Sequence, residues 1–339
     1  MEIILKILGI LLLLLILSYF LGPKAKFEKV DGSPQAELNN IAEAIVLVNK
    51  ENARTSNIKP DNQSQFIWVD SLKKTEYAFL YLHGFSASHG ESEPIITNLA
   101  HTYACNTYLP RLYLHGLNDV DAFAKLNPKD LVESAKKAIA IGKAIGEKLI
   151  IVSCSTGSTL ATYLAAFDDD IEAMIMTSPN FDLYDQNSHL LLKPWGKQIF
   201  RQMMGGNYRQ WDASPDINKY WTTKNRIEAH IAIRSLLDQT MIDDIFKKID
   251  IPIYAGYFFV DENKMDKIIS IDAIKHFEKT ISTPKENIKI VPFDNARGHV
   301  ISSKYMNKNW ENVQFSIFDF CENVIGLKRA HTTYLPATG

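Results

Sequence analysis

The chain has 339 residues, of which 46% are apolar and 22% charged, and its formal net charge is −2. This composition is typical of a globular protein and argues against a disordered chain. A net charge this close to zero leaves no basic field to hold a nucleic-acid backbone, so we exclude that class of partner. The three cysteines, Cys105, Cys154 and Cys321, are too few and too scattered for a disulfide framework or a zinc site.

The amino-terminal residues differ from the rest of the chain, because residues 3–21 are apolar apart from Lys6 and Ser18. A helix of this length would rise ~28 Å, which is close to the thickness of one bilayer core. No small-x-small cleavage pattern follows it, so we expect residues 1–23 to be an uncleaved single-pass anchor rather than a signal peptide. Lysines flank both ends and do not orient the helix clearly. We expect the rest of the chain to be exported, on the periplasmic or extracellular face.

Residues 24–64 are expected to form a polar linker and one helix. Ser33 and Pro34 are typical of a helix N-cap and a first helical turn. Apolar residues follow at helical spacing, at Leu38, Ile41, Ile45 and Val48. We therefore expect a helix that starts at Ser33 and packs against a globular domain.

Short apolar runs alternate with helical patterns over the remaining chain. Strands are expected at residues 65–69, 77–82, 104–109, 148–152, 171–177, 251–259 and 288–293. Helices are expected at residues 130–147, directly after Ser155, and at residues 271–279. This alternation predicts an α/β fold with a mostly parallel central sheet covered by helices on both faces. It stops over residues 180–250, so we expect a core of residues 65–179 and 251–327 with a helical cap insertion.

The most informative stretch is residues 148–161, where an apolar strand pattern breaks into small residues around Ser155 and continues as a helix. A small-x-Ser-x-Gly turn at this point resembles the nucleophile elbow of the α/β-hydrolases, which lifts a serine hydroxyl off the sheet. Small neighbours are needed because the turn is crowded and the serine backbone is strained. Ser153 stands where the usual pattern has glycine. The alternative interpretation is a serine-rich helix N-cap.

A second strand end fits the same family. His83, Gly84 and Phe85 follow the strand at residues 77–82 and resemble the oxyanion-hole turn of the α/β-hydrolases. The resemblance implies that the backbone N–H groups of Phe85 and Thr156 would bind the oxyanion. The alternative is that His83 is an internal hydrogen-bonding histidine.

A third strand end resembles one branch of this superfamily. Pro110-Arg111 and His115-Gly116 are similar to a stretch found in monoacylglycerol lipases and lysophospholipase-like proteins, a branch with serine aminopeptidase-like members. That loop is largely structural in the branch, so we assign it no chemical role. The resemblance covers about residues 66–325 and is to a bacterial, membrane-anchored member of the branch.

Two aspartates are candidates for the acid that would orient a catalytic histidine. Counting from the strand start favours Asp261, whereas Asp266 opens an Asp-Lys-Ile-Ile-Ser sequence that resembles the family's Asp-x-Val-Val-Ser/Pro pattern. We expect Asp266, and the alternative for both is a solvated loop carboxylate. His299, in a Gly-His-Val-Ile sequence after the last strand, lies where the family has its general base. Ser155, Asp266 and His299 then follow in the serine, acid, histidine order of the α/β-hydrolases.

The resemblance implies a serine hydrolase that cleaves carboxylic esters, either a carboxylesterase or a lipase acting on monoacylglycerol or lysophospholipid. His299 would take the proton of Ser155, and Asp266 would orient the imidazole. The alternatives are a serine aminopeptidase or acyltransferase on the same fold, and a non-catalytic binding protein suggested by Ser153. No metal-ligand spacing, dinucleotide fingerprint or P-loop is present in the sequence, so we expect no cofactor.

The cap insertion is rich in bulky apolar residues, which suits an acyl chain or another apolar part of a substrate. These residues are Phe181, Tyr184, Leu190, Leu191, Leu192, Trp195, Phe200, Met203, Met204, Trp211, Tyr220 and Trp221. The alternative is that they form the cap's own core. Met203-Met204-Gly205-Gly206 is a candidate hinge. In the tail, residues 328–339, Leu335–Gly339 resembles a sortase recognition motif and is left out of the functional argument.

Overall fold

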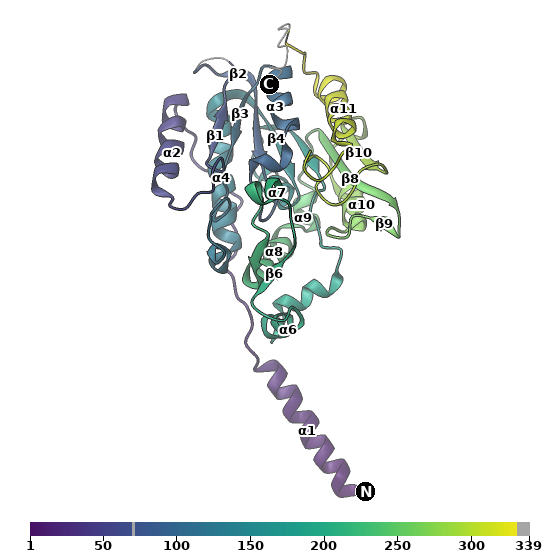
Figure 1. Ribbon diagram of the computed structural model, residues 1–339. Helices are drawn as coiled ribbons and strands as arrows, with labels where there is room; N and C mark the ends of the chain where they lie inside the picture. Colours follow the sequence, from purple (N-terminus) through teal and green to yellow (C-terminus); the bar gives the residue numbers. More distant parts are fainter. Residues whose placement is uncertain (70–71, 331–339) are drawn as a thin grey trace.

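The protein is described by a computed structural model that covers residues 1–69 and 72–330. Figure 1 shows a body built around one twisted sheet, from one end of which the helix α1 (Glu2–Phe20) extends. The sheet has the strand order β1-β3-β2-β4-β5-β8-β10, and β9 pairs with β8. The strands are β1 (Gln65–Ile67), β2 (Thr75–Leu82), β3 (Asn106–Leu109), β4 (Gly146–Cys154), β5 (Ile171–Thr177), β8 (Ile253–Asp261), β9 (Lys264–Met265) and β10 (Ile288–Phe293).

Every strand expected from the sequence is present, with ends shifted by a few residues. β1 pairs with β3 in the antiparallel sense, as does β9 with β8, and the other pairs are parallel. The prediction of a mostly parallel sheet is therefore confirmed. Parallel strands place their carboxyl ends at one edge, where the loops that follow β2, β4, β5, β8 and β10 come together.

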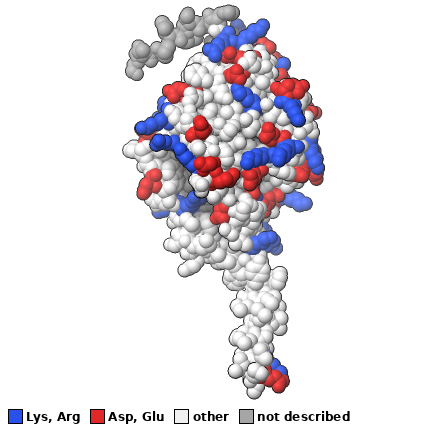
Figure 2. Space-filling view, turned by 90° about the vertical axis from the view of Figure 1, so that its right-hand side faces the viewer, with Lys and Arg blue, Asp and Glu red and all other residues white. Residues whose placement is uncertain are grey.

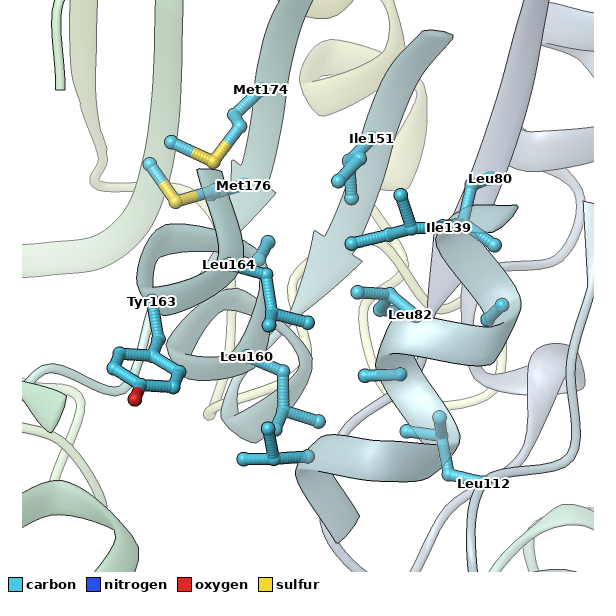
Figure 3. Packing of buried hydrophobic residues seen from close by; sticks show 14 of the residues in the cluster. Leu80, Leu82, Leu112, Ile139, Ile151, Leu160, Tyr163, Leu164, Met174 and Met176 are labelled. Carbon is cyan, nitrogen blue, oxygen red and sulfur yellow. The ribbon is translucent and has the colours of Figure 1, made fainter. Parts of the chain in front are cut away.

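Helices cover both faces of this sheet. They are α2 (Ile41–Arg54), α3 (Ile95–Thr102), α4 (Pro128–Ile145), α5 (Thr156–Ala165), α10 (Ile271–Thr280) and α11 (Trp310–Phe320). Along β2, Leu80 and Leu82 join the core that α4 and α5 cover, whereas Phe79 and Tyr81 join the core under α3 and α11. Figure 3 shows the first of these cores, where strand residues meet Ile139 of α4. Burial on both faces explains why these strands read as nearly continuous apolar runs.

The helix near the start of the body begins later than the sequence predicts. We expected it to start at Ser33, but α2 starts at Ile41 and its N-cap is Asn40, whose side chain accepts the N–H of Glu43 at 3.0 Å. The Ser33 hydroxyl is bound instead to Asp31. Ser33 and Pro34 are thus residue types that can start a helix, but the helix starts at a second capping sequence seven residues later, at Asn40. The α2 face that carries Ile41 and Val48 packs against the body as expected.

Residues 180–250 contain short elements of both kinds. They are η3 (Gln186–Leu192), α6 (Gly196–Met203), β6 (Tyr208–Gln210), α7 (Pro215–Tyr220), β7 (Lys224–Arg226), α8 (Ile227–Thr240) and α9 (Asp243–Phe246). The insertion is mostly helical, as expected, and it also contains an antiparallel hairpin of β6 and β7 that the sequence did not predict. The Tyr208 ring on β6 lies under the charged ends of Lys224 and Arg226 on β7, and such cross-strand contacts stabilise a short hairpin.

A minority of the bulky residues of this insertion are buried in its core, whereas a larger group is exposed. Phe181, Leu191, Tyr220 and Trp221 are buried. Leu190, Trp195, Met203, Met204 and Trp211 are exposed. The Met-Met-Gly-Gly sequence ends α6 at Met203 and continues as a turn in which both glycines have positive φ.

The helix α1 is long and apolar, with a mean hydropathy of 2.7, and none of its residues is buried. Its last turn contacts the body through one side chain, because the Trp195 indole N–H donates to the carbonyl of Ser18 at 2.9 Å. The Trp195 backbone N–H donates to the carbonyl of Pro23, also at 2.9 Å. The motif at Leu335–Gly339 lies outside the described residues.

Candidate active site

The strand-to-helix turn at Ser155 has the strained backbone that the sequence suggests. Ser155 lies between β4 and α5 with φ 51° and ψ −118°, a conformation that side-chain-bearing residues rarely adopt. Its N–H donates to the carbonyl of Thr177 on β5 at 3.1 Å, which holds the turn in place. At Gly157 a Cβ atom would overlap the carbonyl oxygen of Leu82, so only glycine fits there. The glycine of the Ser-x-Gly sequence thus lets α5 pack directly against the end of β2.

The departure from the family pattern at Ser153 is accommodated by a hydrogen bond. Its side chain is fully buried, and its hydroxyl lies 3.0 Å from that of Ser158 on the first turn of α5. The Ser153 carbonyl accepts the hydroxyl of Thr177 at 3.2 Å. A buried hydroxyl is costly only when it lacks a partner, so serine fits where the pattern has glycine.

The structure brings Ser155, His299 and Asp266 together in one hydrogen-bonded chain. His299 Nε2 lies 2.8 Å from Ser155 Oγ, and His299 Nδ1 lies 2.7 Å from Asp266 Oδ2. The other oxygen of Asp266 accepts the backbone N–H of Ile268 at 2.8 Å. A carboxylate only accepts hydrogen bonds, so Nδ1 carries the proton and Nε2 is free to accept the serine hydroxyl. The arrangement can therefore move a proton from Ser155 to His299.

Asp261, the competing candidate, lies elsewhere. It is exposed at the turn between β8 and β9, where its side chain accepts the N–H groups of Asn263 at 2.8 Å and Lys264 at 3.0 Å. Asp266 follows β9 and is buried beside His299. The short β8–β9 hairpin explains why the sequence offered two candidates. β8 ends at Asp261, and β9 then returns the chain to the site just before Asp266.

The charges around His299 favour its protonated form. Burial by itself lowers the pKa of His299, but the adjacent Asp266 carboxylate, through its charge and its hydrogen bond, raises it above its ordinary value of 6.5. The carboxyl of Glu91 raises the pKa of His299 further. An imidazolium that forms during a proton transfer would be stabilised here.

The turn that carries the expected oxyanion donors lies directly against Ser155. A Cβ atom at Gly84 would lie 3.2 Å from the Cβ of Ser155, which places the Gly84–Phe85 backbone beside the hydroxyl. Thr156 is the first residue of α5, so its N–H has no acceptor within the helix. Both amides expected from the sequence thus border the space next to Ser155, and their binding of an oxyanion stays a prediction.

His83 is an internal hydrogen-bonding residue, as the alternative interpretation had it. Its Nε2 accepts the N–H of Leu112 at 3.1 Å, and its Nδ1 donates to the carbonyl of Gly84 at 3.0 Å. Burial and the neighbouring His115 hold the pKa of His83 well below its usual range, which keeps the ring neutral. His83 therefore fixes the Gly84–Phe85 turn against the loop after β3. In that loop Arg111 donates to the carbonyl of His115 and to Thr55, which fits the structural role expected of it.

Glu91 is a buried acid next to this site that the sequence did not single out. It lies on η1 (His89–Ser92), where one carboxyl oxygen accepts both the backbone N–H of Gly84 and, at 2.9 Å, the hydroxyl of Tyr81. Burial raises the pKa of Glu91 to about 7. Nothing in the local sequence separates this glutamate from a surface residue, because its burial arises from the packing of η1 over β2.

Ser178 is a second residue that sequence reasoning missed. It has a positive φ of 48° just after β5, and its hydroxyl donates to the carbonyl of His299. Its own N–H donates to the carbonyl of Gly256 on β8 at 2.6 Å. Ser178 thus holds the loop of the histidine to the strands beneath it.

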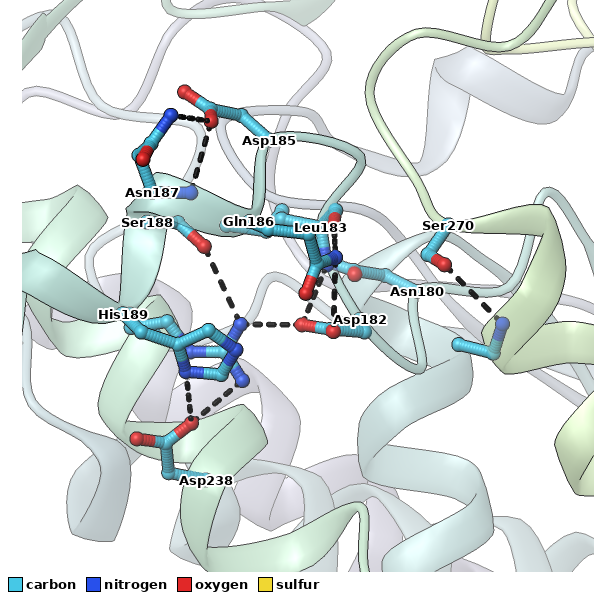
Figure 4. Close-up of polar contacts among 12 residues, drawn as sticks. Asn180, Asp182, Leu183, Asp185, Gln186, Asn187, Ser188, His189, Asp238 and Ser270 are labelled. Carbon is cyan, nitrogen blue, oxygen red and sulfur yellow. Dashed lines mark hydrogen bonds and ion pairs between the residues drawn. The ribbon is translucent and has the colours of Figure 1, made fainter. Parts of the chain in front are cut away.

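Two acids at the start of the cap insertion are occupied by protein partners (Figure 4). Asp182 forms an ion pair with Arg234 of α8, which is itself buried. Asp185 accepts the backbone and side-chain N–H groups of Asn187, both at 3.0 Å. The backbone N–H of Ser270 donates to the carbonyl of Asp182 at 2.8 Å, which ties the cap to the loop that carries Asp266. Among the described residues, no group of three His, Cys, Asp or Glu side chains is placed to hold a metal ion.

Comparison with known proteins identifies the fold. No protein-family model matches the sequence, and no curated protein does. Among solved structures, a metagenome-derived lipolytic enzyme from the study of LipS and LipT superposes with a TM-score of 0.62 at 12% identity, covering 78% of this chain and 98% of that one. The monoacylglycerol lipase of Paleococcus ferrophilus gives 0.55 at 14% identity, covering 76% and 96%.

An epoxide hydrolase from Bacillus megaterium gives a TM-score of 0.52 at 12% identity, covering 76% of this chain and 96% of that one. Together with the sheet order, these similarities show that the chain has the α/β-hydrolase fold. Proteins of this fold act on different bonds, so the fold alone does not decide the reaction.

Proposed function

We propose that this chain is a serine hydrolase that cleaves carboxylic esters through an acyl-enzyme on Ser155. The observation that carries the proposal is the hydrogen-bonded chain from Ser155 Oγ through His299 to the buried Asp266. A buried carboxylate, a correctly oriented imidazole and a strained serine turn together form the arrangement that activates a serine hydroxyl.

The proposed reaction has two halves. His299 takes the Ser155 proton at Nε2 while Ser155 Oγ attacks the ester carbonyl, and the alcohol leaves after His299 returns the proton to it. A water molecule then gives its proton to His299 and attacks the acyl-enzyme, which releases the acid and restores Ser155. The negative oxygen formed in each half would lie beside the N–H groups of Phe85 and Thr156.

Two observations favour an ester over the amide of a peptide with a free amino group. An aminopeptidase needs a carboxylate to bind the substrate's ammonium group, but Asp182, at the start of the cap insertion, is already paired with the buried Arg234. The cap places an uncharged ring near the site, since His230 of α8 packs against the Phe85 ring with centroids 5.4 Å apart and burial lowers the pKa of His230 to about 4. We therefore propose lipid-derived esters, such as monoacylglycerol or lysophospholipid, as the substrate class.

We also propose that α1 anchors the chain in a membrane. It is exposed and apolar, and its 19 residues match one bilayer core. Export of the body, and the division into residues 24–64, core, cap insertion and tail, remain predictions from the sequence.

Covalent labelling with a fluorophosphonate tests the nucleophile. The purified chain should be labelled, Ser155→Ala should not be, and Ser282→Ala, which changes an exposed serine, should be labelled as well as the parent chain. Labelling that persists in Ser155→Ala would place the nucleophile elsewhere and end the proposal.

A substrate panel tests the reaction and its alternatives. It contains p-nitrophenyl esters of increasing chain length, a monoacylglycerol, a lysophospholipid and an aminoacyl amide, each with and without an added alcohol as acyl acceptor. The proposal expects hydrolysis of esters, with a preference for longer chains. Faster cleavage of the amide would favour a peptidase, and dominant transfer to the alcohol would favour an acyltransferase. No turnover together with no labelling would favour a binding protein.

A further inference from the structure

The helix α6 carries an apolar stripe that the protein leaves exposed. Ile199 and Met203 are four residues apart and therefore lie on one side of the helix, and Trp195, the N-cap, comes four residues before Ile199. The exposed fractions of Trp195, Ile199 and Met203 are 37%, 51% and 76%. Phe200, on the other side, packs towards His230 of α8. We call Trp195, Ile199 and Met203 the α6 stripe.

The stripe begins at the point where α1 meets the body. Trp195 donates from its indole to Ser18, in the last turn of α1, and from its backbone to Pro23. Gly22 makes this contact possible, since a Cβ atom there would overlap the Trp195 indole. Figure 1 shows α6 at the end of the body from which α1 extends. If α1 crosses a bilayer, Ser18 lies about 3 Å from the end of the helix, so Trp195 lies at the level of the lipid headgroups.

The charges around the stripe suit a membrane surface. Exposed basic residues lie near its start: Lys24 and Lys26 are in the linker, and Lys193, which lines the same pocket as Lys24, is two residues before Trp195. The acid beneath α6, Glu228, is paired with Lys197 at 2.8 Å and with Arg226 at 3.1 Å. On the face in Figure 2, acidic and basic side chains are mixed over the body, and the part next to α1 is mostly uncharged with a few basic residues.

We propose that the α6 stripe inserts into the headgroup region of the same bilayer that α1 crosses, so that the cap is held against the membrane. A tryptophan at the interface, apolar side chains on one side of a helix and lysines nearby are the features of an interfacial helix. The juxtamembrane lysines would add attraction to anionic lipids. The proposal depends on the insertion of α1 and is independent of the chemistry at Ser155.

Continuity with α1 favours lipid over a protein partner. The contacts of Trp195 with Ser18 and Pro23 fix the stripe next to the membrane-spanning helix. A second copy of this chain or another protein would have to enter the space between α6 and the bilayer. The stripe also covers only one side of an eight-residue helix. Its area is smaller than the area that a stable protein–protein interface buries.

Site-specific fluorescence in nanodiscs tests the proposal on the full chain. The native cysteines are all buried, so an exposed cysteine introduced by Met203→Cys takes a polarity-sensitive fluorophore selectively. The chain is reconstituted in nanodiscs of phosphatidylcholine and phosphatidylglycerol. A spin label on the lipid near the headgroup should quench about half of the M203C signal, and aqueous iodide should quench it little.

Two further variants provide controls. Val46→Cys places the same fluorophore on α2, at a residue that is 65% exposed, and should respond to iodide and not to the lipid label. Leu12→Cys reports whether α1 itself is inserted and should be quenched by a label deep in the bilayer. If M203C behaves like V46C, the proposal is wrong. If M203C is protected from iodide without being quenched by the lipid label, a protein covers the stripe and the proposal is also wrong.

Discussion

At the scale of single residues, the position of Asp266 distinguishes the two candidate acids. Asp266→Asn keeps the shape of the side chain but removes the charge that orients the Nδ1–H of His299 and stabilises the imidazolium. We expect kcat for a p-nitrophenyl ester to fall by about 10⁴-fold. The matched variant Asp261→Asn, at the hairpin turn, should keep nearly full activity. Equal losses in the two variants would contradict the assignment.

The neighbouring carboxyl of Glu91 should set the pH range of activity. His299 accepts a proton only when neutral, so kcat/KM should rise with pH through its pKa, which lies above 6.5. The charge of Glu91 raises the pKa of His299, so Glu91→Gln should lower that pKa and move the acid limb of the pH profile to lower pH. The amide oxygen of glutamine can still accept the N–H of Gly84.

The control for this prediction is Tyr81→Phe. It removes the hydroxyl that donates to Glu91 at 2.9 Å but leaves the carboxyl in place. A pH profile of kcat/KM for all three proteins separates the charge of Glu91 from its structural role. An acid limb that stays at the same pH in Glu91→Gln would show that this carboxyl does not act on His299.

The serine that departs from the family pattern should contribute to stability rather than to chemistry. Ser153→Gly restores the common residue but removes the hydrogen bond to Ser158 and adds freedom to the unfolded chain. We expect the free energy of unfolding to fall by about 1–2 kcal/mol while kcat stays close to that of the parent chain. Urea unfolding and an ester assay measure the two effects. A large loss of kcat with unchanged stability would contradict this explanation.

The sequence predicted those candidate site residues that can be recognised from their place directly after a strand or before a loop-fixing apolar pair. Ser155 and His299 follow strands of a recognisable pattern, and Asp266 precedes two apolar residues that fix its loop. Glu91 and Ser178 were not predicted, because their contacts with Gly84 and with the carbonyl of His299 arise only when distant elements pack together. The local sequence around each of these two residues is that of an ordinary turn and carries no signal of its role.

At the scale of elements, the strands were predictable because burial on both faces demands apolar runs, and these leave a clear signal. The starts of helices were less predictable than the strands, since residues that can cap a helix occur at several places along the chain. The linker contains one apparent cap at Ser33 and the one used at Asn40. The β6–β7 hairpin was also missed, because its strands have only three residues each and carry mostly polar side chains.

The two capping sequences allow a direct comparison. Asn40→Ala removes the side chain that accepts the N–H of Glu43, so we expect the first turn of α2 to be destabilised by about 1 kcal/mol. Ser33→Ala lies outside the helix and should leave α2 unchanged. Hydrogen exchange of the α2 amides measures both effects. Faster exchange in Ser33→Ala than in Asn40→Ala would mean that the helix starts earlier.

At the scale of the whole molecule, the cap insertion links the membrane end of the chain to the candidate site. Its first residues are bound to the loop of Asp266, since the N–H of Tyr184 donates to the carbonyl of Ile268 at 3.0 Å. Its α6 contacts α1 through Trp195, and its α8 contacts the Gly84–Phe85 turn through His230. Ser155, beside that turn, is 7% exposed. Contact of α6 with a bilayer would therefore be transmitted through the cap to the turn beside Ser155.

This coupling predicts that a charge on the α6 stripe affects lipid substrates and spares soluble ones. Met203→Glu places a carboxylate where we propose a headgroup contact, and displacing α6 from the interface should cost about 1 kcal/mol. In nanodiscs, kcat/KM for a long-chain monoacylglycerol held in the bilayer should fall about fivefold. Turnover of p-nitrophenyl acetate, which reaches the site from water, should not change. Val46→Glu, which adds the same charge on α2, should alter neither rate, and a fall in both rates for Met203→Glu would show damage to the fold instead of lost membrane contact.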